Sequence, residues 1–315
     1  FFTLLLAVIS TMTTFAQTEP AIELQAEVDG NTRTFTIGLA TEGTVQIDWG
    51  GNGEKVTSEV IPAYDGWNQV NVSGTVSGDG KVKIYGDNIV YFECSSRVDG
   101  AQVLSLDVTK ATTLKDLTAN TNKLASIDLT KNTELEKLTI NNNQLTSIDI
   151  SKCTKLTTLD ITNNLLTAID ITKNQALQTL RIGQNKLAGE LDLSTNPTIK
   201  SVYALTNELT SVKIGNNTAS KPYFSFNYNK LTSIDASGIN DAKNAILFLI
   251  GNQLTEIKLP SMKMKTLNIS KNNFTLATLP GPDATTAAKG FTYAPQNDYV
   301  IAESYKVGDV LDLSS

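Results

Sequence analysis

A column of aspartates is the feature of this 315-residue chain whose spacing could do chemistry. An aspartate between apolar residues, as in SIDI, recurs at Asp107, Asp128, Asp149, Asp170, Asp192 and Asp235. Carboxylates stacked about 5 Å apart on successive coils would repel one another, and a bound cation would relieve that repulsion. However, lysines follow three residues later at Lys110, Lys131, Lys152 and Lys173, and Lys213 and Lys258 replace the aspartate in two other copies. We therefore predict solvated charge pairing on a convex surface and no metal site.

The residue types that most catalytic and metal sites need are scarce. The chain has no histidine, which removes the commonest general base and the commonest zinc ligand. Cys94 and Cys153 lie in no metal-binding pattern, and the coils between them put them beyond disulfide reach, so we predict two free thiols. Asp116 and Asp160 are too far apart for a paired-carboxylate site. We expect no catalytic residues, no cofactor and no enzymatic activity.

An internal repeat positions these residues. Asn-x-Leu, with Phe in place of Leu in the last copy, marks eight copies at Asn122, Asn143, Asn164, Asn185, Asn207, Asn229, Asn252 and Asn272. The first three intervals are 21 residues, and the later ones are 22, 22, 23 and 20. A period of this length indicates a solenoid, in which each copy packs against the next.

The copies at 135–145 (LEKLTINNNQL), 156–166 and 177–187 fit the leucine-rich repeat pattern L-x-x-L-x-L-x-x-N-x-L. Alternation on a short strand directs Leu138 and Ile140 inward and Lys137 and Thr139 outward. The asparagine after the strand offers donors and an acceptor to backbone groups that lose their partners at the turn, so we assign the asparagine ladder a structural role. The predicted fold is a leucine-rich repeat solenoid, a parallel β-sheet horseshoe or right-handed coil with little helix, with a small N-terminal β-domain.

The flanking segments follow other patterns. Residues 1–17 are typical of a truncated signal peptide, and the run is too short to span a membrane. Alternating strand patterns at 18–88 predict an N-terminal β cap domain, and the repeats occupy 89–280 with a degenerate first coil. Residues 281–315 are expected to form a C-terminal cap or the start of a further β-domain in a chain truncated at both ends. A net charge of -6 and a pI of about 4.9 argue against nucleic acid as a partner.

The repeats, as in NNQLTSIDISKCTKLTTLDIT, together with the apolar start and the β-segments, resemble internalin-like leucine-rich repeat proteins of bacterial surfaces, especially those of Bacteroidetes. The resemblance covers residues 89–280 well and the flanks loosely. It implies a secreted or surface-displayed protein whose concave sheet binds a protein or, less often, a glycan. No sorting signal or lipoprotein cysteine is present in the sequence given, so the mode of cell attachment stays open.

The outward strand positions change character along the repeats. In the first four copies they are mostly small and polar, whereas in the next three they become apolar and aromatic. The predicted ligand-binding residues are Arg181, Tyr203, Leu205, Tyr223, Ile246, Phe248 and Ile250. Aromatic residues and arginine dominate binding hot spots, which favours recognition of a protein in adhesion or host interaction. Two alternatives stay open: the patch binds a glycan, or the irregular spacing shifts the register and places these side chains under a loop.

Overall fold

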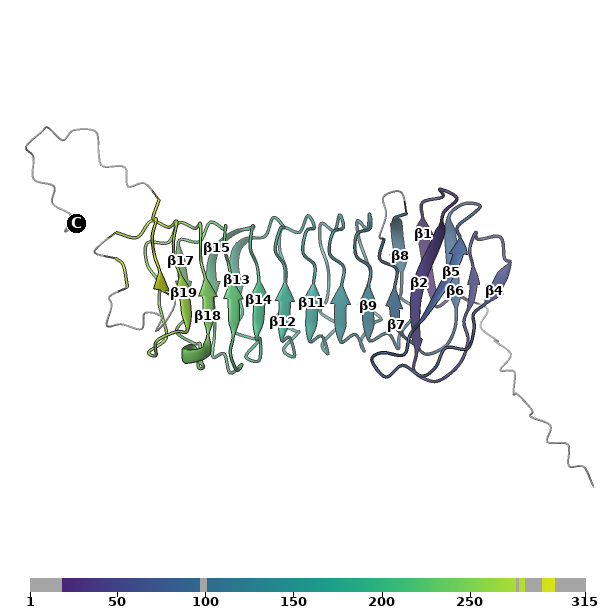
Figure 1. Ribbon diagram of the computed structural model, residues 1–315, viewed down its shortest axis with the longest axis horizontal. Coiled ribbons are helices and arrows are strands. Elements are labelled where there is room, and N and C mark those ends of the chain that lie inside the picture. The colour runs from purple at the N-terminus through teal and green to yellow at the C-terminus, as the bar shows by residue number, and fades with distance from the viewer. Residues whose placement is uncertain (1–18, 97–100, 276–277, 281–290, 298–315) are drawn as a thin grey trace, which may run out of the picture.

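The chain forms an elongated stack of coils with a small β-domain at its N-terminal end (Figure 1). The computed structural model describes residues 19–96, 101–275, 278–280 and 291–297. The predicted signal peptide at 1–17 lies outside these residues, and so does the predicted C-terminal segment at 281–315 except for 291–297. Over the described ranges, no helix is long and apolar enough to cross a membrane. The one helix among them is a single 3-10 turn, η1 (Ala242–Asn244).

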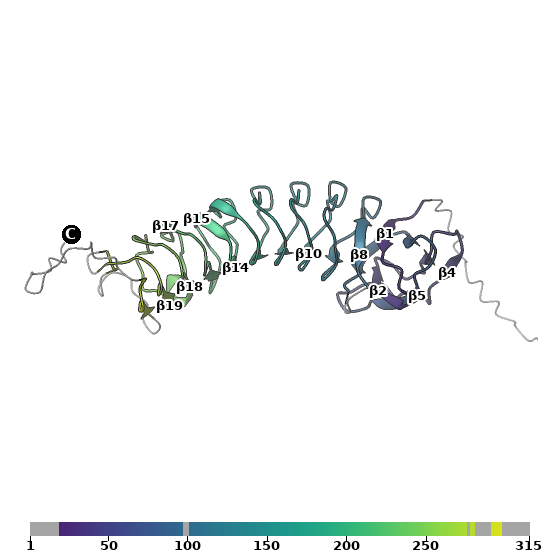
Figure 2. The same ribbon diagram turned by 90° about the horizontal axis from the view of Figure 1, so that it is seen from above.

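Twelve strands form one sheet on the concave side of the arched stack (Figure 2). Ten of them pair in parallel, and the last two, β2 and β5, belong to the N-terminal β-domain and pair antiparallel. In sheet order the strands are β20 (Phe291–Thr292), β19 (Thr266–Asn268), β18 (Ile246–Phe248), β16 (Tyr223–Ser225), β14 (Ser201–Tyr203), β12 (Thr179–Arg181), β11 (Thr158–Asp160), β10 (Lys137–Thr139), β9 (Asp116–Thr118), β7 (Ile89–Glu93), β2 (Thr32–Leu39) and β5 (Val70–Thr75).

The register of this sheet places the outward side chains in two rows. The first row is Tyr91, Asp116, Lys137, Thr158, Thr179, Ser201, Tyr223, Ile246 and Thr266. The second row is Glu93, Thr118, Thr139, Asp160, Arg181, Tyr203, Ser225, Phe248 and Asn268. Between the rows, residues such as Leu138, Leu159 and Phe224 point into the solenoid and are fully buried. Burial of such a side chain stabilises the fold by about 1.5–3 kcal/mol.

The asparagine ladder connects each coil to its neighbour. Asn164 Oδ1 accepts a hydrogen bond from the Leu145 N–H at 3.0 Å, and its amide nitrogen donates to the Ile140 and Ile161 carbonyls, each at 3.1 Å. The same pattern repeats along the ladder, as at Asn143 and Asn229. The side chains of the ladder are buried, except for the partly buried Asn185. These contacts are those that a structural role requires.

A second asparagine ladder, which the sequence analysis missed, lies at the opposite turn of the coil. Asn132, Asn174, Asn196 and Asn217 are buried there, and each amide nitrogen donates to a backbone carbonyl of the preceding coil. Cys153 occupies the position of this ladder between Asn132 and Asn174, and its Sγ lies 3.8 Å from the Leu129 carbonyl oxygen. The prediction of two free thiols is confirmed, since Cys94 and Cys153 are both buried and unpaired. Burial raises the pKa of the Cys153 thiol to about 11.

The aspartate column caps turns, and the predicted solvated charge pairing is confirmed in part, since the lysines three residues later act on the aspartates only as nearby charges. Asp149 Oδ1 accepts a hydrogen bond from the Ser151 N–H at 2.9 Å, and the other five aspartates accept the corresponding bond two residues on. Among the described residues, no ion pair joins these aspartates to the lysine three positions further. Instead, Lys213 and Lys258, which replace aspartates, pair with Asp192 and Asp235 of the preceding coils at 3.4 and 3.6 Å. Nor does any group of three or more potential metal ligands occur in the described part.

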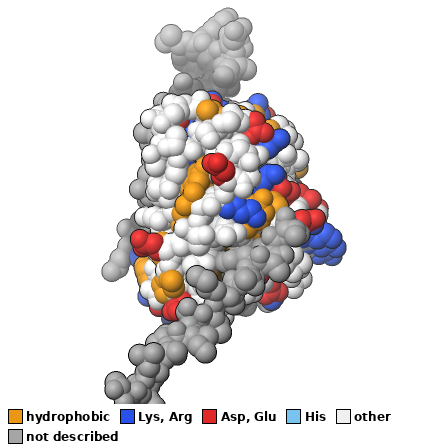
Figure 3. Space-filling model, turned by 90° about the vertical axis from the view of Figure 1, so that its right-hand side faces the viewer, with side chains coloured by type: hydrophobic (Ala, Val, Ile, Leu, Met, Phe, Trp, Pro, Cys, Tyr) orange, Lys and Arg blue, Asp and Glu red, His pale blue; other side chains and the backbone are white. Residues whose placement is uncertain are grey.

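The N-terminal β-domain shares both its sheet and its core with the solenoid. Its second sheet contains, in order, β4 (Lys55–Thr57), β3 (Gln46–Asp48), β6 (Lys81–Tyr85), β1 (Ile22–Ala26) and β8 (Val103–Asp107). The first coil therefore supplies one strand to each sheet, β7 to the concave sheet and β8 to this one. Phe35 packs on Phe92 of β7 with ring centroids 5.7 Å apart, within an apolar core that continues to Phe274. The outer end of this domain has a largely polar surface with small apolar groups (Figure 3).

The extra residues of the irregular copies lie outside the concave strands. One lies at Ala188–Gly189, where Gly189 has a φ of 79° at the start of β13. Others lie in the turns before β16 and β18, and the second of these turns contains η1. On the back of the stack, a three-stranded parallel sheet forms from β13 (Ala188–Asp192), β15 (Glu208–Lys213) and β17 (Ser233–Asp235). The register of the concave sheet consequently continues without a shift from β12 to β18.

Candidate functional site

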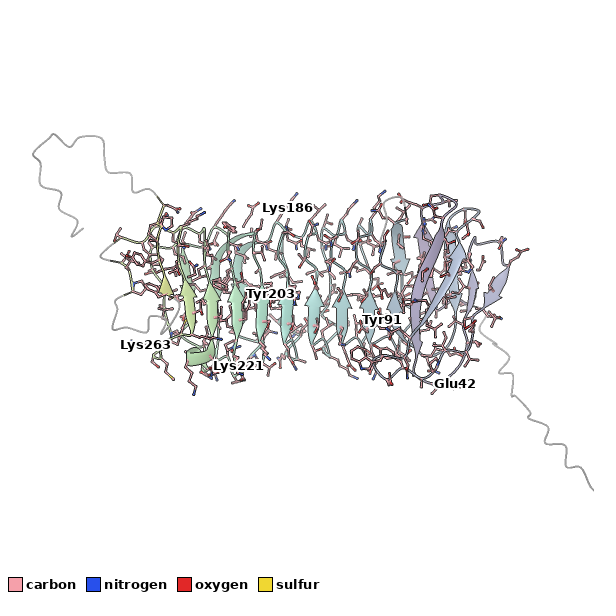
Figure 4. The ribbon with its side chains drawn as sticks, in the orientation of Figure 1. Glu42, Tyr91, Lys186, Tyr203, Lys221 and Lys263 are labelled. Atoms are coloured by element: carbon pink, nitrogen blue, oxygen red, sulfur yellow. The ribbon has the colours of Figure 1, made fainter. Side chains whose placement is uncertain are left out.

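The predicted ligand-binding residues come together on the concave sheet, and we call them the aromatic patch: Arg181, Tyr203, Leu205, Tyr223, Ile246, Phe248 and Ile250. The Tyr203 and Tyr223 rings lie 5.0 Å apart, and Tyr223 meets Phe248 edge to face at 5.8 Å. The Arg181 guanidinium lies over the Tyr203 ring, 4.3 Å from its centroid. The four neighbouring strands β12, β14, β16 and β18 thus position one contiguous cluster of a cation and three rings, of which Tyr203 is labelled in Figure 4.

Mutual stacking accounts for much of the burial of the patch. Arg181 is exposed, whereas the six apolar and aromatic members are half-buried. Each ring covers part of the next, as strands about 4.8 Å apart require. Burial raises the pKa of the Tyr223 hydroxyl, with a smaller contribution from Tyr203. The register shift that would place these side chains under a loop does not occur, because Arg181, Tyr203, Ser225 and Phe248 are aligned in one row.

The middle of the concave face differs sharply from the patch. Toward the N-terminus, the second row contains Thr118, Thr139 and Asp160, whose side chains are small and polar. A shallow depression of about 340 Å³ adjoins Arg181 and Tyr203, and polar groups of Asn141, Asp160 and Gln184 line it. Arg181 makes no ion pair within 4.0 Å in the described part of the chain, so its charge is available to a ligand.

One further aromatic residue beside the patch escaped the sequence analysis. Tyr228, directly before the ladder residue Asn229, is 53% exposed and has a φ of 56°. Its ring lies against Gly251, where a Cβ atom would approach Tyr228 Cδ1 to 2.6 Å. A glycine is therefore required for this ring position. The positions before the other ladder asparagines hold mostly Asn, Thr or Gln, so a tyrosine in that column was the available clue.

The fold is that of a leucine-rich repeat solenoid, and the aromatic patch on its concave sheet is accessible for contact with a ligand. Residues 133–174 match the family model described as Leucine Rich repeats (2 copies). The sequence prediction of the fold class is confirmed. No curated protein matches the chain.

Several solved structures are similar in fold. The functional domain of InlJ from Listeria monocytogenes is 17% identical over 70% of this chain and 66% of its own, with a TM-score of 0.34. The effector YopM from Yersinia pestis is 19% identical over 51% of this chain and 50% of its own, with a TM-score of 0.40. The ectodomain of the Arabidopsis thaliana receptor kinase GASSHO1/SCHENGEN3, solved with CASPARIAN STRIP INTEGRITY FACTOR 2, is 18% identical over 59% of this chain and 27% of its own, with a TM-score of 0.42. The chain thus spans about two thirds or less of these proteins.

Proposed function

We propose that this protein is a non-enzymatic binding protein whose aromatic patch recognises another protein. The observation that supports the proposal is the contiguous cluster of Arg181, Tyr203, Tyr223 and Phe248, next to strands β9 to β11, whose outward side chains are polar. Aromatic rings add large contact area with little loss of side-chain entropy, and arginine adds directional hydrogen bonds. The stacked rings are already ordered, so binding would fix few additional rotamers.

The test is partner binding by a variant that removes the three rings, Tyr203→Ala, Tyr223→Ala and Phe248→Ala. Proteins from host-cell or bacterial-surface extracts that the wild type captures are identified, purified and titrated against both forms. A matched control, Thr118→Ala, Thr139→Ala and Thr158→Ala, changes the same sheet outside the patch. Each hot-spot ring contributes about 2 kcal/mol or more, so the ring variant should lose at least a hundredfold in affinity while the control retains it. Equal affinity of both variants would refute the proposal.

Glycan binding by the same patch is the second candidate. The depression beside Tyr203 supports it, because the amides and the carboxylate around it could hydrogen-bond hydroxyls while the ring packs on a sugar face. A glycan array probed with the wild type and the ring variant separates the two classes of ligand.

We further propose that the protein acts outside a bacterial cell, secreted or displayed on the surface, as an internalin-like adhesion or host-interaction protein of the Bacteroidetes type. The apolar run at 1–17, which is typical of a signal peptide, supports export. The test is export: in a bacterial host, a fusion of the full chain to a reporter should reach the extracytoplasmic fraction. Deletion of residues 1–17 should keep the reporter inside.

A further inference from the structure

A second group of aromatic residues lies at the other end of the concave sheet, where the N-terminal β-domain meets the first coils. Tyr91 on β7 heads the first row (Figure 4), and the Tyr64 ring stacks on it with centroids 5.4 Å apart. The Tyr64 N–H donates to the Leu39 carbonyl at 2.7 Å, which fixes the segment beside the sheet. Gly38 leaves room for the ring, because a Cβ there would lie 2.8 Å from Tyr64 Cδ2. The stack is therefore built from both domains.

A depression of about 490 Å³ opens beside Tyr64, within the roughly 300–1,000 Å³ that small-ligand sites occupy. Two ion pairs frame it. Lys137 Nζ lies 3.7 Å from Asp116 Oδ2, and Lys115 Nζ lies 3.6 Å from Glu136 Oε1. Burial raises the pKa of the Asp116 carboxyl against the opposing effect of Lys137, in agreement with its partly desolvated position.

The charges around the depression nearly cancel. Its lining contains three carboxylates, of Asp65, Asp116 and Glu136, and two ammonium groups, of Lys115 and Lys137, which leaves a net charge of -1. An anionic ligand would meet the carboxylates, a cationic ligand would meet the lysines, and an apolar ligand would desolvate both ion pairs. A hydroxyl group both donates and accepts, so it can bind to a carboxylate and an ammonium group at the same time.

An exposed tryptophan follows a residue that lines the same depression. Trp67 is 86% exposed and directly follows Gly66, which lines the depression. Asp65 fixes this turn, because its Oδ1 accepts hydrogen bonds from the Trp67 and Asn68 N–H groups at 2.9 and 3.0 Å. A tryptophan so exposed, held on an ordered turn, offers a flat apolar face to a ligand.

We propose that Tyr64, Trp67, Asp116 and Lys137 form a binding site for a neutral saccharide, separate from the aromatic patch. The Trp67 indole packs on the apolar C–H face of a sugar ring. Asp116 and Lys137 hydrogen-bond neighbouring hydroxyls, and the Tyr64 ring, held by Tyr91, closes the inner wall. Asp116 and Lys137 lie four and three strand spacings from Tyr203, about 19 and 14 Å along the sheet, so one saccharide unit cannot contact both them and Tyr203.

Isothermal titration with neutral oligosaccharides tests this site in the full chain. The probes are linear gluco-, manno-, xylo- and N-acetylgluco-oligosaccharides of four to six units, with pentalysine and pentaglutamate as charged comparisons. At least one saccharide should bind with a Kd of about 0.01–1 mM, which is ordinary for a shallow site. Trp67→Ala and Asp116→Asn should each weaken that binding at least tenfold, whereas Val60→Ala, at another exposed apolar position of the same domain, should not.

Tryptophan fluorescence supplies a second measurement, which detects binding without relying on the heat that binding releases or absorbs. Of the two tryptophans, Trp49 is 8% exposed and Trp67 is 86% exposed, so Trp67 dominates quenching by acrylamide. The bound saccharide should protect Trp67 from acrylamide in the wild type and in the ring variant of the aromatic patch.

Three results would overturn the proposal. They are an absence of binding by every saccharide at 10 mM, tighter binding of either charged peptide, and saccharide binding that survives both Trp67→Ala and Asp116→Asn. Circular dichroism of each variant shows whether the fold is kept. If only the ring variant lost saccharide binding, the saccharide site would be assigned to the aromatic patch instead. The protein-binding proposal is tested separately, because its readout is the affinity for a protein partner.

Discussion

Neighbouring residues of the asparagine ladder should be energetically coupled, because they share acceptors. The Ile161 carbonyl accepts one hydrogen bond from Asn164 at 3.1 Å and another from Asn185 at 3.0 Å. Asn164→Ala alone leaves the Leu145 N–H unpaired, but Ile161 keeps its bond from Asn185. An unpaired buried backbone group costs about 1–3 kcal/mol, so the single substitution should lower the free energy of unfolding by that amount plus the loss of packing.

The double substitution Asn164→Ala with Asn185→Ala removes both donors to Ile161. Its cost should exceed the sum of the two single costs by about 1–3 kcal/mol, the penalty of one further unpaired carbonyl. The matched control is Asn164→Ala with Asn229→Ala, because Asn229 donates to Ala204 and Phe226 and shares no acceptor with Asn164. That pair should be additive to within about 0.5 kcal/mol.

Equilibrium unfolding in urea, followed by far-ultraviolet circular dichroism, measures the stability of the wild type and of the three single and two double variants. The slope of the unfolding free energy against urea concentration must be equal among these proteins. A solenoid can unfold in parts, and a changed slope would indicate partial unfolding. A coupling energy between Asn164 and Asn185 that is as small as the control value would refute the shared-acceptor mechanism.

Three other predictions concern the turns of the solenoid. Cys153→Asn should raise the free energy of unfolding by about 1 kcal/mol. The new amide could donate to the Leu129 and Asn132 carbonyls, as Asn174 donates to the equivalent carbonyls one coil later. Urea unfolding measures this change, and Asn174→Cys should lower the same free energy. Thr206 is a β-branched residue with a φ of 58°, a conformation that asparagine adopts more easily, so Thr206→Asn should stabilise the fold by about 1 kcal/mol. Asn163→Thr, where φ is 54°, should destabilise the fold by a similar amount. Thermal unfolding measures both changes. Hydrogen bonds in the turns lower the pKa of Asp128, Asp149 and Asp170 in the folded state. The ionised carboxylates therefore stabilise the fold fully above the unfolded-state pKa near 4, and this stabilisation is lost as the pH falls below that value. Substitution of all three by Asn keeps an acceptor in each turn and should flatten the decline of the melting temperature below about pH 4; an unchanged decline would contradict this assignment.

The periodic part of the fold was predictable because every copy repeats the same physical requirement. Leu138 and Leu159 must point inward for the coil to have a core, and a buried asparagine must satisfy the turn, so spacing alone defines the strands. The second ladder was harder to find, since Cys153 interrupts it and its asparagines lie in polar turns where asparagine is common. The turn-capping role of the aspartates was not predicted, because sequence spacing gives proximity but not direction. Asp149 lies close enough to Lys152 for the charge to lower its pKa, yet its carboxylate bonds to Ser151.

The candidate sites differ in how far the sequence could predict them. Counting outward positions from each ladder asparagine identified the aromatic patch, because the register is regular there. The Tyr64 and Trp67 site could not be found this way. It joins a segment of the N-terminal β-domain to Asp116 and Lys137 of the second and third coils, and no local pattern predicts which part of a non-repeating domain meets the first coil.

In the irregular copies the outward side chains change from polar to aromatic, while the register of the concave strands is kept. An extra residue within a concave strand would reverse the alternation and turn Tyr203 or Phe248 into the core, where Val202 and Leu247 already fill the space. The extra residues instead lie at Gly189 and in the turns before β16 and β18, which can lengthen at little cost because their backbone contacts solvent. The strands therefore keep a one-to-one register from Arg181 to Phe248, and their side chains meet at spacings that permit stacking. Insertion of one residue between Ala219 and Ser220, in the turn before β16, should consequently leave the patch intact, whereas insertion between Tyr223 and Phe224 should disrupt it together with the core.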